Sequence, residues 1–222
     1  MLRRKIELCM TLLLLVGMII VSKKLSQLVA SENVQAQKEV GVIDAGHGGH
    51  DPGKVGVNDA LEKDINLQIA KKVKKRLEKN GIEVVMTRED DVMEDTKLED
   101  MKKRVALINK TKPVITVSIH QNSYTDSSIK GAQVFYYAGS DVSKEAASLM
   151  QEELRKIDTS NTRQIKSNSD FYMLKKTEVP TIIVECGFLS NPGEAEKLVT
   201  DEYQEEMARA ICDGVITWLS RS

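Results

Sequence analysis

The stretch that decides the fold is Val40-Gly41-Val42-Ile43-Asp44-Ala45-Gly46-His47-Gly48-Gly49-His50. Its first six residues are apolar apart from Asp44 and glycine, as in a strand buried on both faces, and glycines follow at once. Two histidines stand where the chain leaves this strand. Histidine is the commonest neutral metal ligand, so this stretch indicates a buried strand that delivers a metal ligand to one end of a sheet.

Strands and helices alternate after this stretch. Further strands are expected at residues 82–87, 114–120, 132–137, 171–174 and 181–186, and helices at residues 61–80, 98–110, 142–157 and 202–219, with a short helix opening at Pro192. Most of the strands lack a polar face, which is typical of a parallel sheet covered on both sides. We therefore predict an α/β fold: a single domain with a twisted, mainly parallel sheet of about six strands and helices on both faces.

The first residues have a different character. Three basic residues, at positions 3–5, precede an apolar run at residues 8–21. A basic flank before such a run is typical of a secretory signal, and the run is shorter than the roughly 20 residues of a comfortable membrane span. We expect residues 1–24 to be a signal peptide or an N-terminal membrane anchor, residues 25–38 a polar tether, and residues 39–222 an exported domain.

The charge pattern argues against a nucleic-acid partner. The formal net charge is -1, the basic residues are scattered, and aromatic residues make up only 4% of the chain. A nucleic-acid interface would require a clustered basic surface.

Two further motifs fall at predicted strand ends. They are Ser118-Ile119-His120-Gln121-Asn122 and Val184-Glu185-Cys186-Gly187-Phe188. The chain has three histidines, and all of them lie in the first two motifs. Because ligand sites in such sheets form beyond the carboxyl ends of the strands, the three motifs predict a hydrolytic metal site at this edge.

A catalytic zinc usually takes three protein ligands and keeps one position open. His47 and His120 supply two of them. Glu62 is the best third candidate, because it opens the helix after the glycine-rich loop that follows His47. Spacing alone leaves three alternatives to Glu62, namely Asp51, Asp59 and Asp64.

Glu185 is the candidate proton carrier. It follows an apolar strand, where an unpartnered charge is costly, and near a metal it can take a proton from water and deliver it to a leaving amine. The alternative is a structural carboxylate paired with Arg88 or Arg104.

Three other side chains have open roles. Asp44 either orients His47 or caps the loop. His50 is expected to be exposed or to face the substrate, and Asn122 to hold the loop after His120 or to touch the substrate.

The motifs, in this order, resemble the zinc-dependent N-acetylmuramoyl-L-alanine amidases of bacterial cell walls. The resemblance covers residues 40–219 and includes the segments 44–49, 62–63, 85–88, 98–109, 118–122 and 185–191. It implies a zinc ion held by His47, Glu62 and His120, with Glu185 as catalytic acid and base. Arg88, in one of the matching segments, is a possible supporting or substrate-binding residue. The implied reaction in peptidoglycan cleaves the amide between the lactyl carbonyl of muramic acid and the nitrogen of L-alanine in the stem peptide.

The short chain with its N-terminal apolar segment further resembles the CwlD-type, germination-specific amidases of spore-forming bacteria. That resemblance implies a role in forming muramic-δ-lactam in the spore cortex and a location in the intermembrane space of the forespore. Because no wall-binding module accompanies the domain, we expect placement by the N-terminal membrane segment or by an exported accessory protein.

Two other functions are compatible with parts of this pattern. One is a zinc peptidase that cuts within stem peptides. The other is a tethered wall-binding domain without catalysis, against which the combination of His47, Glu62, His120 and Glu185 argues.

Overall fold

The computed structural model describes residues 4, 10, 14–24 and 39–221. The chain divides into two units, Met1–Lys38 and Glu39–Ser222. In the first unit, residues 14–24 are helical, and the predicted tether at residues 25–38 lies outside the described residues, as does most of the stretch before residue 14. None of the helices in the described ranges has both the length and the apolarity to cross a membrane.

The second unit is built on a six-stranded sheet within residues 39–221, with the order β2-β1-β3-β6-β4-β5. The strands are β1 (Val40–Ala45), β2 (Glu83–Met86), β3 (Ile115–Asn122), β4 (Gln133–Tyr137), β5 (Lys166–Asn168) and β6 (Thr181–Phe188). All neighbouring pairs are parallel except β4 and β6, which are antiparallel. The predicted α/β class with a mainly parallel sheet is therefore confirmed.

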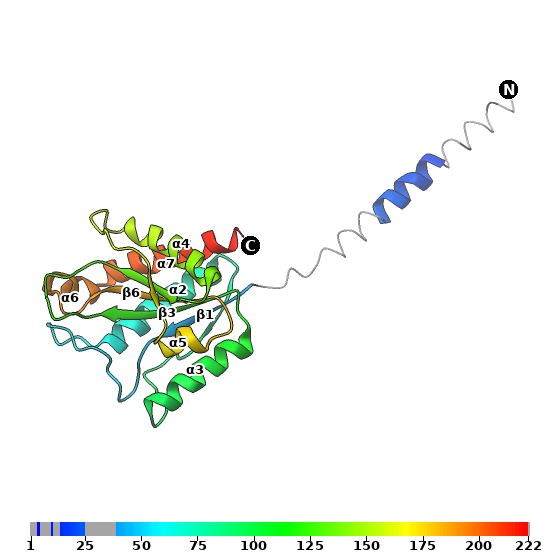
Figure 1. Ribbon diagram of the computed structural model, residues 1–222. Coiled ribbons are helices and arrows are strands. Elements are labelled where there is room, and N and C mark those ends of the chain that lie inside the picture. Colours follow the sequence, from blue (N-terminus) through cyan, green and yellow to red (C-terminus); the bar gives the residue numbers. More distant parts are fainter. Residues whose placement is uncertain (1–3, 5–9, 11–13, 25–38, 222) are drawn as a thin grey trace. The chain divides into compact units, whose positions relative to one another are not determined.

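Helices cover both faces of the sheet. They are α2 (Glu62–Lys79), α3 (Lys97–Thr111), α4 (Asp141–Arg155), α5 (Tyr172–Lys176), α6 (Pro192–Leu198) and α7 (Asp201–Leu219). Figure 1 shows α2, α4 and α7 on one face and α3 and α5 on the other, in agreement with their packing contacts. α6 packs at the end of β6 and against α7.

Strand alternation divides the buried residues between two cores. Ile43, Ile119 and Val184 point into the larger core, under α2, α4 and α7. Val42 points the other way, into a smaller core with Val105 of α3. Each fully buried aliphatic side chain of this kind contributes on the order of 1.5–3 kcal/mol, so the larger core supplies most of the stability. The thinner face, under α3 and α5, is the one that holds the candidate site.

Helix α2 ends as its sequence predicts. Gly81 has a φ of 83°, in the left-handed region that glycine tolerates. Its N–H donates to the carbonyl of Glu78, and the N–H of Ile82 donates to that of Leu77. This pattern is a Schellman motif, and it turns the chain directly from α2 into β2.

One predicted element is wrong. Residues 171–174 were expected to form a strand, but the structure has helix α5 there, and the edge position beside β4 is taken by β5. The physical reason lies in Asn168, whose side-chain oxygen accepts hydrogen bonds from the N–H groups of Asp170 and Phe171 and turns the chain away from the sheet. Met173 and Leu174 are then buried from a helix instead of a strand.

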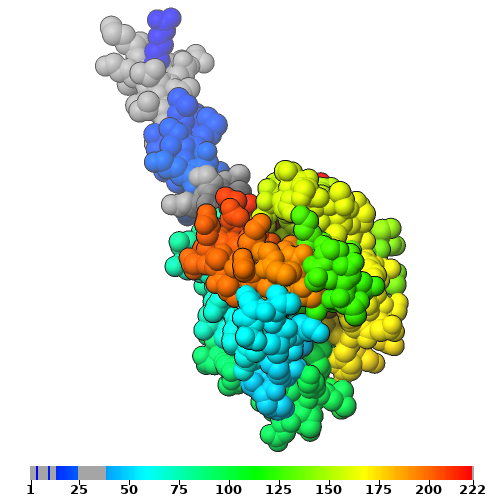
Figure 2. All heavy atoms as spheres, turned by 90° about the vertical axis from the view of Figure 1, so that its left-hand side faces the viewer, coloured from blue at the N-terminus to red at the C-terminus, as the bar shows by residue number. Residues whose placement is uncertain are grey.

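The loops at the carboxyl ends of the parallel strands meet at one end of the domain. Figure 2 looks at this end and shows residues after β1 (cyan), after β3 (green) and after β6 (orange) together on the surface. Hydrogen bonds join them: Val57 N–H donates to the carbonyl of Leu189, and Leu189 N–H to that of Asn122. This is the edge at which the sequence placed the functional motifs.

Candidate active site

His47 is held in an unusual backbone conformation at the end of β1. Its φ is 62°, in the left-handed region that non-glycine residues rarely occupy. The guanidinium of Arg104 donates to its carbonyl at 2.6 Å. Its ring nitrogen Nδ1 lies 2.8 Å from Oδ2 of Asp51, which orients the imidazole and leaves Nε2 directed at Glu62. Such a carboxylate–histidine contact is typical of a metal-binding histidine.

Glu62 is the first residue of α2 and is buried, with 4% of its surface exposed. Its Oε2 accepts a hydrogen bond from the N–H of Lys54 at 2.8 Å, and its Oε1 accepts one from the N–H of Gln121 at 3.1 Å. Burial acts to raise the pKa of Glu62, but hydrogen bonds and charge from His120 and His47 outweigh it and lower the pKa far below its usual range. The carboxylate is therefore ionised and available as a ligand.

His120 lies on β3, and its Nδ1 is 2.9 Å from Oε1 of Glu62. The ring covers Gly46 so closely that a Cβ there would lie 2.2 Å from Cε1 of His120. Burial acts to lower the pKa of His120, but the hydrogen bond and the charge of Glu62 raise it to about 9. Glycine at position 46 thus leaves the space in which His120 faces Glu62.

The three residues form one cluster of possible ligand atoms. Nε2 of His47 lies 3.3 Å from Oε1 of Glu62, and the ligand atoms of His47, Glu62 and His120 all lie within 4.8 Å of one another. Within the described ranges, this is the group of histidine, cysteine and acidic side chains with the spacing to hold a metal ion. The alternatives to Glu62 lie elsewhere: Asp51 contacts the far side of the His47 ring, and Asp59 and Asp64 are exposed.

Glu185 lies beside this cluster. It is the register partner of His120, and alternation puts both side chains on the face covered by α3 and α5. Burial raises the pKa of Glu185 to about 7. Its Oε2 is buried and has no hydrogen-bond partner among the described residues. A buried carboxylate oxygen without a partner, next to three converging ligand atoms, is expected where a bound ligand completes the site.

Neither arginine considered as a structural partner reaches Glu185. Arg104 donates to the carboxylates of Asp44 and Asp100 and to the carbonyls of Ala45 and His47. Within residues 39–221, these contacts use four of the five N–H groups of its guanidinium and direct it to Asp44 and the loop after β1.

Asp44 is the buried anchor for Arg104. It accepts hydrogen bonds from Arg104 at 2.9 Å, from Ser118 at 2.5 Å and from Thr87 at 2.6 Å. Burial acts to raise its pKa, but these partners outweigh burial and hold the pKa of Asp44 below its usual range. Of its two expected roles, the structure favours the second: Asp44 does not contact the His47 ring and instead fixes the loop through Arg104.

Arg88, His50 and Asn122 lie away from the cluster of ligand atoms. Arg88 is buried and donates to the carbonyls of Ala45, Gly46, Lys63 and Asp90, so it fastens the loop to α2. His50 is exposed. Asn122 accepts from the N–H of Ser123 with its side chain, and it holds the loop after β3.

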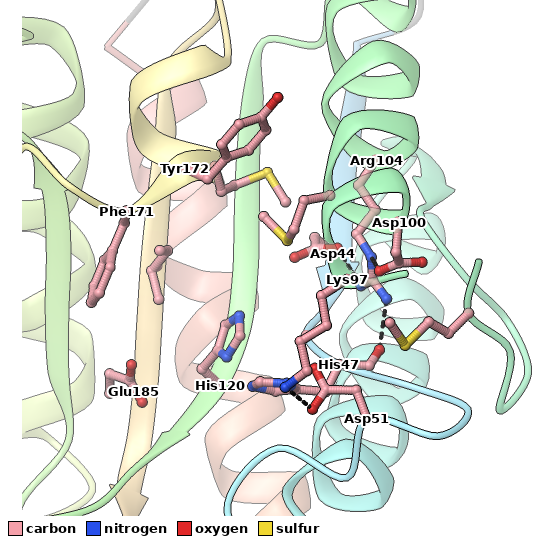
Figure 3. Close-up of a pocket in the computed structure, with 15 residues that line it drawn as sticks. Asp44, His47, Asp51, Lys97, Asp100, Arg104, His120, Phe171, Tyr172 and Glu185 are labelled. Atoms are coloured by element: carbon pink, nitrogen blue, oxygen red, sulfur yellow. Dashed lines mark hydrogen bonds and ion pairs between the residues drawn. The ribbon is translucent and has the colours of Figure 1, made fainter. Parts of the chain in front are cut away.

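A pocket of about 360 Å³ opens over the cluster. Figure 3 shows His47, His120 and Glu185 at its base, α3 along one side, and Phe171 and Tyr172 at the other. Its apolar wall consists of Met93, Met101, Phe171, Tyr172, Met173 and Ile183. This wall was not predicted from the sequence, which placed Phe171 and Tyr172 in a strand of the sheet, whereas they lie at the start of α5.

Comparison with known proteins agrees with this geometry. The family model for N-acetylmuramoyl-L-alanine amidases matches residues 42–217, which span nearly the whole of the second unit. This chain belongs to the N-acetylmuramoyl-L-alanine amidase family. Its enzymatic activity is accordingly that of an N-acetylmuramoyl-L-alanine amidase.

Three family members match this chain over most of their own length. The germination-specific amidase of Bacillus subtilis is 37% identical over 187 residues, which cover 80% of this chain and 78% of the relative. The CwlD amidase of Clostridioides difficile, solved in complex with the GerS lipoprotein, is 38% identical, with a TM-score of 0.80 over 83% of this chain and 100% of that one. The catalytic domain of CwlV from Bacillus (Paenibacillus) polymyxa is 33% identical, with a TM-score of 0.75 over 83% and 99% of the two chains.

The ion pair beneath the amidase site yields a stability prediction. Arg104→Ala leaves Asp44 buried without its cation, and breaking such a pair typically costs about 3–5 kcal/mol. We therefore expect a lower free energy of unfolding in urea titrations. Lys103→Ala, at the preceding position of α3, is the control: Lys103 and Glu94 form a surface ion pair, and we expect little change. Equal stability of the two variants would contradict the role given to Arg104.

Proposed function

We propose that this amidase depends on zinc held by His47, Glu62 and His120, and that Glu185 is its catalytic acid and base. The observation that carries the proposal is the convergence of three ligand atoms beside the unpartnered Oε2 of Glu185. The bond cleaved is then the amide between the lactyl group of N-acetylmuramic acid and L-alanine of the peptidoglycan stem peptide.

The donor set fits zinc. Two imidazoles and one carboxylate match the ligands of catalytic zinc sites that keep a position open. Asp51 fixes the ring of His47, and backbone N–H groups fix the carboxylate of Glu62, as outer-shell partners do at such centres. When bound, zinc supplies Lewis-acid polarisation of the scissile carbonyl and lowers the pKa of a water molecule.

Glu185 supplies the proton transfers that hydrolysis of the amide requires. Glu185 takes a proton from the attacking water and delivers it to the nitrogen of L-alanine as the amide breaks. A pKa of about 7 lets one carboxyl group serve as base and then as acid near neutral pH. The apolar wall around Phe171 and Met173 borders the pocket in which this proton transfer takes place.

Product analysis tests the bond assignment. Mass spectrometry of muropeptides after digestion should show free stem peptides that begin with L-alanine. Fragments cut within the stem would instead indicate a zinc peptidase.

We extend the proposal to the spore cortex, in the formation of muramic-δ-lactam. Similarity to the germination-specific amidase of Bacillus subtilis and to the CwlD amidase supports this role. Residues 1–24 would then be a signal or anchor, residues 25–38 a tether, and residues 39–222 the catalytic domain in the intermembrane space of the forespore. The complex of the CwlD amidase with the GerS lipoprotein supports an exported accessory protein for this chain too.

Zinc dependence predicts a clear effect of chelation. We expect chelated protein to lose muropeptide cleavage and added zinc to restore it. His120→Ala should lose most of its zinc affinity in calorimetric titration, whereas His50→Ala, which changes an exposed histidine outside the cluster, should retain it. Full cleavage by metal-free protein would refute the proposal.

The role of Glu185 predicts a separation of catalysis from metal binding. Glu185→Gln should retain the fold and zinc but lose about 10²- to 10⁴-fold in kcat, because general acid–base catalysis is typically of that size. Glu178→Gln, an exposed change on the segment before β6, is the control. If the Glu185 variant loses zinc, Glu185 is a ligand and the assignment is wrong.

Placement predicts two results. In spheroplasts of vegetative cells, which contain no forespore and produce the tagged full-length chain, external protease should digest residues 39–222. In sporulating cells that produce the same chain, chemical cross-linking should trap an exported protein. Protection of the domain would contradict export, and the absence of any exported cross-linked protein would contradict the accessory partner.

A further inference from the structure

The pocket contains one cation that the proposed chemistry does not use. Lys97 lines the pocket, and its side chain is 70% exposed. Its Nζ lies 2.7 Å from Oδ1 of Asp51. Of the described residues that line the pocket, the other lysine or arginine is Arg104, which is buried and occupied by carboxylates and carbonyls. Lys97 is therefore the accessible cation of the pocket, with Asp51 as its present partner.

Local stability does not explain a lysine at this position. Lys97 is the first residue of α3, where the helix dipole favours acidic side chains and disfavours cations. Its ion pair joins a 70% exposed ammonium to the side chain of Asp51, which is only 9% exposed, so the lysine supports Asp51 while its own Nζ stays accessible from the pocket. A residue that contradicts the local preference is expected at a functional position.

The side chain of Lys97 points toward the cluster of candidate metal ligands. Figure 3 shows Lys97 extending from α3 across the pocket to Asp51 and His47. Oδ2 of the same Asp51 carboxylate contacts Nδ1 of His47 at 2.8 Å. The ammonium of Lys97 is thus separated from the ring of a candidate metal ligand by a single carboxylate group.

Asp51 keeps its partners if Lys97 turns to a ligand. Its Oδ1 also accepts a hydrogen bond from the N–H of Gly53 at 3.3 Å, and its Oδ2 stays with His47. Lys97 can therefore exchange Asp51 for an anion in the pocket without releasing the orientation of His47.

We propose that Lys97 binds the first free carboxylate of the stem peptide and selects substrates that carry it. The proposal rests on the proposed amidase function. On the sugar side of the scissile bond, the lactyl carboxyl group is consumed in the amide. On the peptide side, the glutamyl residue after L-alanine is joined through its γ-carboxyl group, so its α-carboxylate is free unless the cell wall amidates it. That α-carboxylate is the anion nearest to the scissile bond.

The test measures binding by calorimetry to zinc-loaded, full-length Glu185→Gln protein, so that turnover does not enter. Its ligands are two disaccharide tripeptides that differ only in whether the glutamyl α-carboxyl group is free or amidated. We expect the free form to bind about tenfold more tightly, the size of a charge-assisted hydrogen bond. Adding Lys97→Met should reduce the preference to near one, and adding Lys97→Arg should largely restore it. Lys102→Met, an exposed lysine of α3 outside the pocket, should leave the preference unchanged.

Each other outcome contradicts a specific step. Equal affinity of the Glu185→Gln protein for the two tripeptides, or a preference that persists in the Lys97→Met variant, would overturn the assignment of Lys97 while leaving the amidase function intact. An equal loss for both tripeptides together with weaker zinc binding would show that Lys97 acts through Asp51 as a positioning residue, and would also overturn it. Failure of the zinc-loaded Glu185→Gln protein to bind either tripeptide would contradict the proposed function together with the assignment of Lys97.

Discussion

The parallel pairing of β1, β3 and β6 is the constraint on which the rest of the site depends. Asp44 is in register with Ser118, and His120 with Glu185. Because side chains alternate along a strand, this register puts all four on the face covered by α3 and α5. A slip of one residue in β6 would move Glu185 to the opposite face, into the apolar core.

The sheet alone does not place His47, because the chain leaves β1 in an irregular loop. Two buried arginines hold that loop through its carbonyl groups. Arg88 lies in the connection between β2 and α3, and Arg104 lies in α3 itself. Arg88 binds the carbonyls of Ala45 and Gly46, and Arg104 binds those of Ala45 and His47. The negative charge of Asp44 keeps Arg104 in place, so a carboxylate that touches no candidate ligand side chain still determines where His47 lies. The arginines also satisfy backbone carbonyls that an irregular loop leaves without a backbone partner, and an unpaired buried carbonyl would cost free energy.

Sequence reasoning predicted the elements whose signal is local. The buried strands and the helix expected at residues 61–80, which Glu62 opens, follow from periodicity and from the preferences of single residues. Helix α5 and strand β5 were not predicted. The apolar run at residues 171–174 is too short for its periodicity to distinguish a strand from a helix, and the turn made by the Asn168 side chain is not evident from the sequence. The contact of Asp51 with the His47 ring depends on the positive φ of His47, which a sequence pattern does not reveal. The place of Lys97 beside the pocket likewise depends on the fold and is not marked by any sequence motif.

The central claim, that this sheet edge builds a zinc centre from two imidazoles and one carboxylate, is most directly tested by X-ray absorption spectroscopy at the zinc edge of the zinc-loaded chain. We expect only nitrogen and oxygen atoms directly bound to the zinc, together with the more distant scattering of two imidazole rings. The cysteines of the domain, Cys186 and Cys212, are buried with free thiols and lie outside the cluster. A sulfur ligand, or the scattering of a single imidazole, would contradict the account.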